Sequence, residues 1–205
     1  SPMRRVFSFQ TLLLALLFLA SGCARRSQER EYVPLLFPPP PQYERVQFVG
    51  SISSPADLPK QRNAIADFIL GPEPIPFMLA KPIAAKLHDN KLYVADTILN
   101  SVLVFDLLSG EARQLAGDQG VGKVTQANNL TFDDDGRLYV ADKKRNAVLV
   151  YGPDESFLHA WGRPDEVFPV DVAVWGDELF VVDVEQNEIE VWSRADGSLL
   201  RTIGE

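Results

Sequence analysis

The sequence is poor in the residues that build disulfides and metal centres. It contains one cysteine, Cys23, and two histidines, His88 and His159, among 205 residues. A single cysteine excludes an intramolecular disulfide and a cysteine-based structural zinc site. The two histidines fall in different expected strands, one inner and one outer, so we expect them to lie far apart. The sequence therefore argues against a zinc site or an acid–base site shared by histidines.

Positive charge is also scarce. The chain has 20 Lys and Arg against 28 Asp and Glu, for a formal net charge of −8. Nucleic-acid binding needs basic side chains gathered on one face, where they neutralise phosphates and release counterions. The one compact basic run is Lys143-Lys144-Arg145, which we interpret as a solvated turn. No nucleic-acid partner is predicted.

A long hydrophobic run is missing too. Two arginines precede a mostly apolar stretch at 6–20, whose clean part is about ten residues, below the roughly 20 that span a bilayer. This order is typical of a secretion signal. The letters A-S-G-C at 20–23 resemble the bacterial lipobox, whose cysteine is diacylated and becomes the new N-terminus. We expect 1–22 to be a lipoprotein signal peptide and Cys23 to be lipidated; an uncleaved membrane helix is the alternative.

The segment after the cysteine is polar and then proline-rich. It ends in four consecutive prolines, Pro38 to Pro41, and we expect 23–43 to be a tether with a stiff polyproline II end. Lipid on Cys23 would hold the chain at a membrane surface without spanning it. The next residue is Ala24, not the Asp that resembles an inner-membrane retention signal. We expect a location in the cell envelope, with the outer membrane favoured if the organism is diderm.

A repeat occupies the second half of the chain. The letters L-Y-V-A-D occur at 92–96 and again at 138–142, and L-F-V-V-D follows at 179–183. A second apolar alternation starts ten positions after each motif begins, and a further short strand is expected on either side. Four strands in a period of 41 to 46 residues are typical of a β-propeller blade. The predicted blades are 81–124, 125–166 and 167–205.

The motif letters resemble the NHL repeat family, in which L-Y-V-A-D is followed by Asn and V-x-V-F. The resemblance implies an all-β, six-bladed propeller of NHL type, of which this chain supplies about three blades. An Asp at a strand end accepts hydrogen bonds from turn amides, and Asn tolerates positive φ. We therefore interpret the repeated pairs as structural turns: Asp96 and Asn100, Asp142 and Asn146, Asp183 and Asn187.

An additional strand precedes the first blade. Residues 45–50 imitate the fourth strand of a blade, and in closed propellers an N-terminal strand commonly completes the last blade. We expect 44–80 to hold this ring-closing strand and a long connection, either a functional insertion or a cover packed by Phe68, Ile69, Phe77 and Leu79. An open half-ring leaves sheet edges and apolar faces uncovered. The chain is predicted to be a fragment of a six-bladed ring, with self-assembly of half-rings as the alternative.

Two sets of candidate site residues follow from this architecture. Loops joining strands two and three share a face with the inter-blade loops, and that face is the usual binding surface. Its candidates are Thr97, Lys143, Lys144, Arg145, Glu185 and Gln186. On the inner strands, Ala84, Asn129 and Asp171 are equivalent, and Asn129 with Asp171 could bind an ion at the channel entrance. No cofactor is predicted, and calcium, which prefers six to eight oxygen ligands, stays open.

The function predicted from these features is binding, with non-enzymatic activity favoured. The chain would be a lipid-anchored, extracytoplasmic propeller that acts as a protein-binding, ligand-binding or scaffolding module. Its predicted partners are the membrane, through the lipid on Cys23, and another envelope protein or a surface polymer. The alternative is a metal-dependent propeller hydrolase, lactonase or lyase with its site in the central channel. A third possibility is a subunit of an extracytoplasmic electron-transfer assembly.

Overall fold

The computed structural model describes residues 35–39, 41–43, 45–58 and 77–204. The expected signal peptide, Cys23, Phe68 and Ile69 lie outside the described residues. The chain divides into two compact units, Ser1–Gly50 and Ser51–Glu205. In the part of the chain that the structure describes, no helix is long and apolar enough to cross a membrane.

The described part of the first unit is a two-stranded hairpin. Strand β1 (Leu35–Phe37) pairs antiparallel with β2 (Val46–Phe48). We had expected only a tether as far as residue 43. The difference arises because Leu35–Phe37 precedes the prolines, so this apolar triplet keeps every backbone N–H that a strand needs. The strand expected near residue 46 is present and pairs with β1; its ring-closing role stays a prediction.

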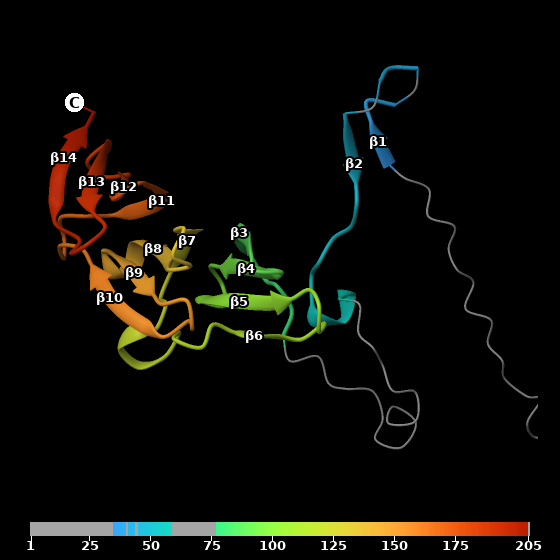
Figure 1. Cartoon of the computed structure of the whole chain (residues 1–205), viewed down its shortest axis with the longest axis horizontal. Coiled ribbons are helices and arrows are strands. Elements are labelled where there is room, and N and C mark those ends of the chain that lie inside the picture. The colour runs from blue at the N-terminus through green and yellow to red at the C-terminus, as the bar shows by residue number, and fades with distance from the viewer. Residues whose placement is uncertain (1–34, 40, 44, 59–76, 205) are drawn as a thin grey trace, which may run out of the picture. The chain divides into compact units, whose positions relative to one another are not determined.

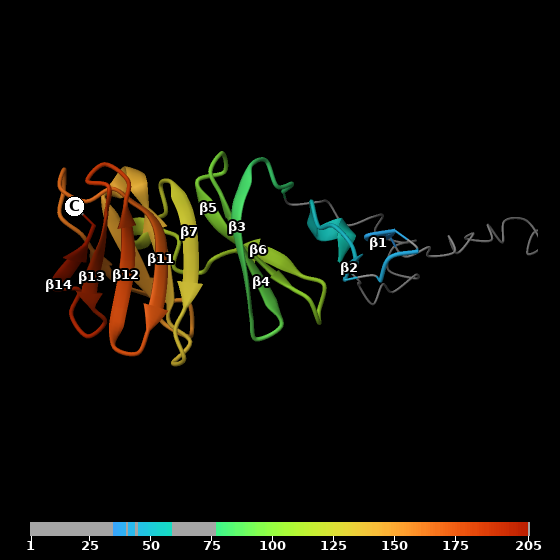
Figure 2. The same cartoon turned by 90° about the horizontal axis from the view of Figure 1, so that it is seen from above.

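The second unit contains three four-stranded antiparallel sheets, each a meander, which confirms the expected all-β fold of about three blades (Figures 1 and 2). The first blade is β3 (Pro82–His88), β4 (Lys91–Asp96), β5 (Ser101–Asp106) and β6 (Ala112–Gln114). The second is β7 (Ala127–Phe132), β8 (Leu138–Asp142), β9 (Ala147–Tyr151) and β10 (Phe157–Trp161). The third is β11 (Pro169–Trp175), β12 (Glu178–Asp183), β13 (Glu188–Ser193) and β14 (Leu199–Ile203).

The blades form an arc with the first strand of each sheet on its inner side. Strands β3, β7 and β11 lie inside the arc in Figure 1, and β6, β10 and β14 lie outside it. The inner strands β7 and β11 are neighbours in both views. The loops that join strands two and three, together with the inter-blade connections, therefore gather at one end of the blades. We call this end the upper face.

Neighbouring blades pack through their sheet faces. Successive side chains of a strand point to opposite faces, so the motif L-Y-V-A-D sends Leu and Val to one face and Tyr and Ala to the other. We call the Tyr/Ala side the forward face, because it meets the next blade, and the Leu/Val side the back face. At the first interface, the forward residues Tyr93, Ala95, Val102 and Val104 pack on the back residues Leu138, Val140, Leu149 and Tyr151. At the second, Tyr139, Ala141, Val148 and Val150 pack on Leu179, Val181 and Trp192.

The back face of the first blade is covered differently, by the connection that precedes it. A third cluster joins the buried Val94, Leu103 and Phe105 of this face to Leu58, and Ile52, Phe77 and Leu79 pack against it. Phe77 and Leu79 thus act as the cover that the sequence predicted. Residues 51–58 and 77–79 are called the cap below.

Candidate functional site

The upper face is organised around the Asp that ends the second strand of each blade. In the first blade, Asp96 is fully buried. Its Oδ2 accepts hydrogen bonds from the N–H groups of Ala80 and Lys81 at 2.7 and 2.8 Å, and its Oδ1 accepts from Ile98 and Leu99 at 3.0 Å each. Burial alone would raise the pKa of Asp96, but these four donors hold it below its ordinary value. The carboxylate therefore joins the incoming connection to the outgoing loop.

The other two blades repeat this arrangement. Asp142 and Asp183 are also buried and accept backbone N–H donors from the preceding connection and the following loop. The donors are Thr125, Gln126 and Arg145 to Asp142, and Phe168, Glu185 and Gln186 to Asp183, at 2.6 to 3.1 Å. The Asn four residues after each Asp is left-handed: Asn100 has φ 51°, Asn146 has φ 56° and Asn187 has φ 57°. Because the carboxylate oxygens accept hydrogen bonds from backbone N–H groups of the connections and loops, they hold these segments in place.

The candidate side chains on the upper face are engaged to different degrees. The Thr97 hydroxyl donates to the Lys81 carbonyl at 3.3 Å. Lys143 and Glu185 form an ion pair between the second and third blades, with Nζ and Oε1 3.6 Å apart. No ion pair is present at Lys144, within the described residues. Gln186 shares the loop of Glu185 and donates its backbone N–H to Asp183.

Arg145 has a role that the sequence did not suggest. Its Nη1 donates to the carbonyls of Val121 and Lys123, at 2.8 and 2.9 Å, in the glycine-containing connection between the first two blades. Arg145 therefore holds this connection in place. Of the three residues in the basic run, only Lys144 has neither a side-chain hydrogen bond nor an ion pair in the described part of the chain.

The upper face also exposes apolar side chains. They occur on a strand-two-to-three loop of the first and third blades and on the connection that Arg145 holds. Ile98 is 61% exposed, Val121 76% and Val184 45%. Single exposed apolar residues are common, but several at one end of a protein mark a candidate interaction surface.

The candidate channel residues come together as a hydrogen-bonded pair. Asn129 and Asp171 pair with the same motif position of their second strands, Ala141 and Val182, and each follows a register shift near the start of its inner strand. Asn129 donates its side-chain N–H to Asp171 Oδ1 across the interface. An amide N–H directed at the carboxylate stabilises it without a cation. Next to this pair, and unforeseen from the sequence, Asn128 Oδ1 is buried and has no hydrogen-bond partner among the described residues.

The first blade interface carries a buried carboxylate that sequence reasoning missed. Glu155, in the β9–β10 turn, is 5% exposed. It accepts two hydrogen bonds from Arg113, at 2.6 and 2.8 Å, and one from the Tyr93 hydroxyl at 3.1 Å. Burial would raise the pKa of Glu155, but Arg113 and the Ala116 N–H hold it below its ordinary value. Burial and the nearby Glu155 raise the pKa of Tyr93.

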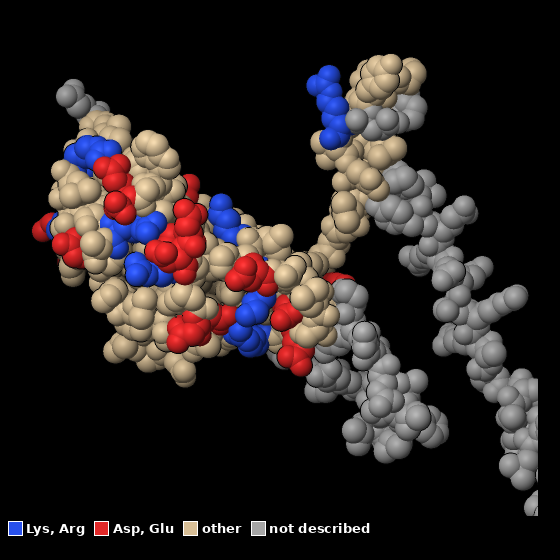
Figure 3. All heavy atoms as spheres, in the orientation of Figure 1, with Lys and Arg blue, Asp and Glu red and all other residues tan. Residues whose placement is uncertain are grey.

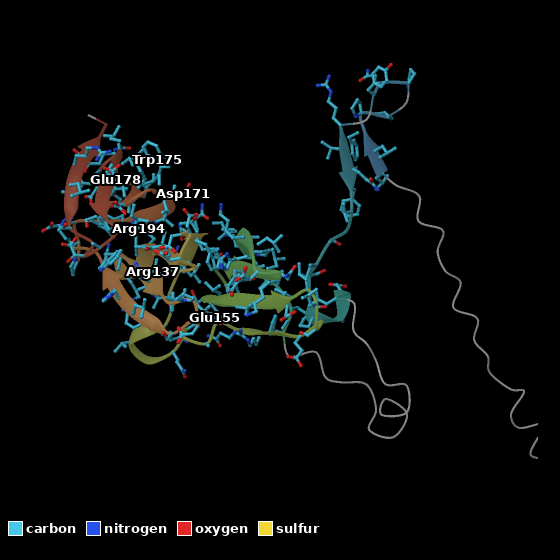
Figure 4. All side chains as sticks on the ribbon, viewed as in Figure 1. Arg137, Glu155, Asp171, Trp175, Glu178 and Arg194 are labelled. Carbon is cyan, nitrogen blue, oxygen red and sulfur yellow. The ribbon has the colours of Figure 1, made fainter. Side chains whose placement is uncertain are left out.

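The second interface is also linked by a buried acid and an arginine from different blades, and we call each such contact a tie. Asp133 accepts the Tyr139 hydroxyl at 3.0 Å and lies 3.7 Å from Nε of Arg194 on the third blade. Burial, with the hydrogen bond to Asp133, raises the pKa of Tyr139 to about 12. Glu155 and Arg194 mark the two ties in Figure 4, and on the side of the blades seen in Figure 3 acidic and basic side chains are interspersed. No sequence signal distinguishes these acids, because Asp and Glu are normally exposed to solvent.

Another buried acid, Glu190, did leave a sequence signal. Glu190 is 2% exposed and stands in the apolar alternation where the second blade has Leu149. It accepts hydrogen bonds from Arg163 and from the Trp192 indole, each at 2.5 Å. A Glu in a core-facing position of a strand predicts a partnered buried charge.

The two histidines are used separately. His88 stacks on Phe132 with ring centroids 4.2 Å apart, and His159 stacks on Trp161 at 5.7 Å. They belong to an inner strand of the first blade and the outer strand of the second, as expected. Across the described ranges, no group of three or more His, Cys, Asp or Glu is placed to hold a metal ion.

Comparison with known proteins identifies the fold. No protein-family model matches the sequence, and no curated protein sequence matches it. Structures similar to this one include a chain of a nidogen–laminin complex, with TM-score 0.53 and 18% identity over 67% of this chain and 53% of that one. A virginiamycin B lyase from Staphylococcus aureus, solved with quinupristin, has TM-score 0.52 and 15% identity over 61% and 41%. Hydrazine synthase from Kuenenia stuttgartiensis has TM-score 0.51 and 18% identity over 63% and 39%.

The matches cover about half or less of each of these three structures. Their low sequence identity means that the similarity concerns the fold alone. All three neighbours are β-propeller proteins, and the second unit has the four-stranded sheets and the sheet-on-sheet packing of such a fold. Its three sheets are therefore blades of a β-propeller.

Proposed function

We propose that this chain is a recognition module, a propeller of NHL type whose upper face binds a protein or surface polymer in the cell envelope. The observation that carries the proposal is the set of three loops held by Asp96, Asp142 and Asp183. Loops that are already ordered lose little conformational entropy on binding. The upper face is thus preorganised to present its exposed side chains.

The chemistry of this surface favours a partner with both apolar and acidic groups. Ile98, Val121 and Val184 offer exposed apolar area, and Lys144 adds a positive charge. An apolar contact with a polar and charged rim is the usual composition of a protein–protein interface. A protein partner fits this set better than a uniformly charged polymer.

Lipid attachment at Cys23 is part of the same proposal. The charged start, the apolar stretch and the A-S-G-C letters support it. Acyl chains would hold the propeller at a membrane surface, with the segment from 23 to 43 between the lipid and the blades. Metabolic labelling with a fatty acid tests this: label is expected on the wild-type chain and not on Cys23→Ser. Equal labelling of both would contradict the anchor.

The binding proposal is tested by cross-linking in intact cells followed by affinity purification. A double variant of the upper face, Ile98→Asp with Val184→Asp, is expected to lose a partner that the wild-type chain recovers reproducibly. Leu108→Asp is the matched control, because Leu108 is 77% exposed but lies in the β5–β6 turn at the opposite end. Failure to recover any reproducible partner, or equal loss with the control, would overturn the proposal.

A further inference from the structure

The third blade has a forward face like those of the first two. Its residues Phe180, Val182, Ile189 and Val191 occupy the positions that Tyr139, Ala141, Val148 and Val150 hold in the second blade. Those second-blade residues form the buried interface with the third. Within the described residues, no blade covers the corresponding face of the third blade.

Much of this face is exposed, although its Val191 is buried. Trp175, at the end of the inner strand, is 78% exposed, and Ile203, which lies opposite Ile189, is 46% exposed. Tyr139 and Ala141, by contrast, are completely buried at the second interface. The forward face of the third blade is therefore a ready-made apolar surface with the pattern of an established interface.

An arginine on this face behaves differently from its counterpart in the first blade. Arg113 lies opposite Val104 and reaches Glu155 on the next blade. Arg201 lies opposite Val191 and instead pairs with Glu178 of its own blade, with Nη2 and Oε2 2.8 Å apart. The third blade thus satisfies its arginine without a neighbour, and Figure 4 labels Trp175 and Glu178 on this blade.

The cap lies at the other end of the arc of blades, on the first blade, where a neighbouring blade would otherwise pack. It covers the back face of the first blade, which is the kind of face that receives a forward face at the two internal interfaces. Phe77 packs edge-on against Phe105 with ring centroids 5.8 Å apart, and Leu58 is 6% exposed. The Leu79 N–H donates to the Ser53 carbonyl at 2.8 Å, which joins the two segments of the cap.

The cap is a smaller contact than a blade. It contributes four side chains to the apolar cluster, Ile52, Leu58, Phe77 and Leu79, of which only Leu58 is buried and the other three are partly buried. Replacing it by a forward face would keep the back face covered and would also bury the open apolar surface of the third blade. Burial of apolar area drives this exchange, and exposure of the cap opposes it.

We propose that the cap is a displaceable substitute for a blade, and that the third blade of a second copy of this chain takes its place on the first blade. As far as the described residues show, each copy has one forward face that no blade covers and one capped back face. Reciprocal exchange therefore joins two copies in a closed ring with two identical interfaces. This proposal goes beyond the recognition function and does not depend on the upper face.

The test uses full chains, solubilised in detergent, in a pull-down between two differently tagged copies. The immobilised copy carries Phe77→Ser, which weakens the cap, and Phe180→Lys, which blocks its own forward face. The wild-type chain is the soluble copy. The matched control is a soluble copy that has the same N-terminus and differs from the wild type only by Phe180→Lys. We expect retention of the wild-type chain to exceed that of the control by at least about tenfold, the effect of placing a charge in the centre of an apolar interface.

Two results would overturn the proposal: equal retention of the wild-type chain and the control, or retention of neither. Near-ultraviolet circular dichroism checks that the immobilised copy is folded. If Phe77→Ser unfolds it, Ile52→Ser replaces that change, because Ile52 is a partly buried member of the cap. The same difference between wild type and control is then required. A soluble copy with Ile98→Asp should still be retained, which separates this contact from binding at the upper face.

Discussion

The forward faces of the second and third blades have the same pattern of residues and opposite surroundings. Tyr139 and Ala141 lie in a core between two sheets, whereas the equivalent Phe180 and Val182 keep partial solvent exposure. The alternation that defines each face is equally clear in both strands. An apolar face in a repeat protein is thus a core only where a neighbour covers it.

The largest expected difference between the two faces is in stability. Tyr139→Ala removes a completely buried ring and its hydrogen bond to Asp133, and should lower the free energy of unfolding by about 3–5 kcal/mol. Phe180→Ala should lower it by only about 1 kcal/mol, because solvent already reaches that ring. Urea denaturation of the full chain in detergent, at a dilution at which it is monomeric, measures both. Equal losses would mean that the third forward face is covered in solution.

The next comparison concerns the two equivalent arginines. Arg113→Ala leaves Glu155 buried without its cation and should cost about 2 kcal/mol, a value reduced from that of a fully buried pair because Arg113 is half exposed. Arg201→Ala breaks an exposed pair within one blade and should change the unfolding midpoint very little. The same denaturation experiment distinguishes them. A larger loss for Arg201→Ala would contradict the assignment of Arg113 as an inter-blade tie.

The first interface should also respond to pH. The pKa of Glu155 is lowered in the folded protein, so its ionised form contributes stability at neutral pH that is lost as the pH falls below its ordinary value of 4.5. Burial opposes this lowering of the pKa, and Arg113→Ala removes its main cause, the hydrogen bonds from the guanidinium. We expect the wild-type chain to lose more stability than Arg113→Ala between neutral and acidic pH. Parallel urea midpoints against pH for the two chains would contradict this.

The smallest effect is expected at Trp175. Trp175→Ser removes a large side chain that is 78% exposed, and should change the free energy of unfolding of the monomer by no more than about 0.5 kcal/mol. The comparison is Trp192→Ser in the same blade, where the ring is completely buried and its indole donates to Glu190. A substantial loss at Trp175 would show that another surface covers it.

Much of the fold was predictable because the repeat is local. The strands of each blade, the tight turns and the left-handed Asn after each motif follow from alternation and turn chemistry within about 45 residues. The pairing of Leu35–Phe37 with Val46–Phe48 was missed, since the adjacent prolines favoured an extended tether. Proline excludes strand hydrogen bonds at its own nitrogen but leaves the residues before it able to pair.

The candidate site was less predictable. Arg145 belonged to a basic run that resembled a solvated turn, yet two carbonyls of another loop fix its position. Asn129 and Asp171 were equivalent in the repeat, but that equivalence did not reveal that the amide of one faces the carboxylate of the other. Side chains on loops find partners on neighbouring blades, roughly 20 to 60 residues away in the chain, and a local pattern contains no information about such pairs.

The sequence by itself determined the blade pattern, the two faces of every sheet and the turn carboxylates, because each depends on neighbours within one repeat. Only the tertiary structure decided which faces are cores, which turn acids tie one blade to the next, and what covers the first blade. These features depend on how whole sheets pack together. The same alternating residues can pack against a blade, pack against a cap or face solvent. The open forward face of the third blade and the cap on the first are therefore features that the repeat motif alone could not reveal.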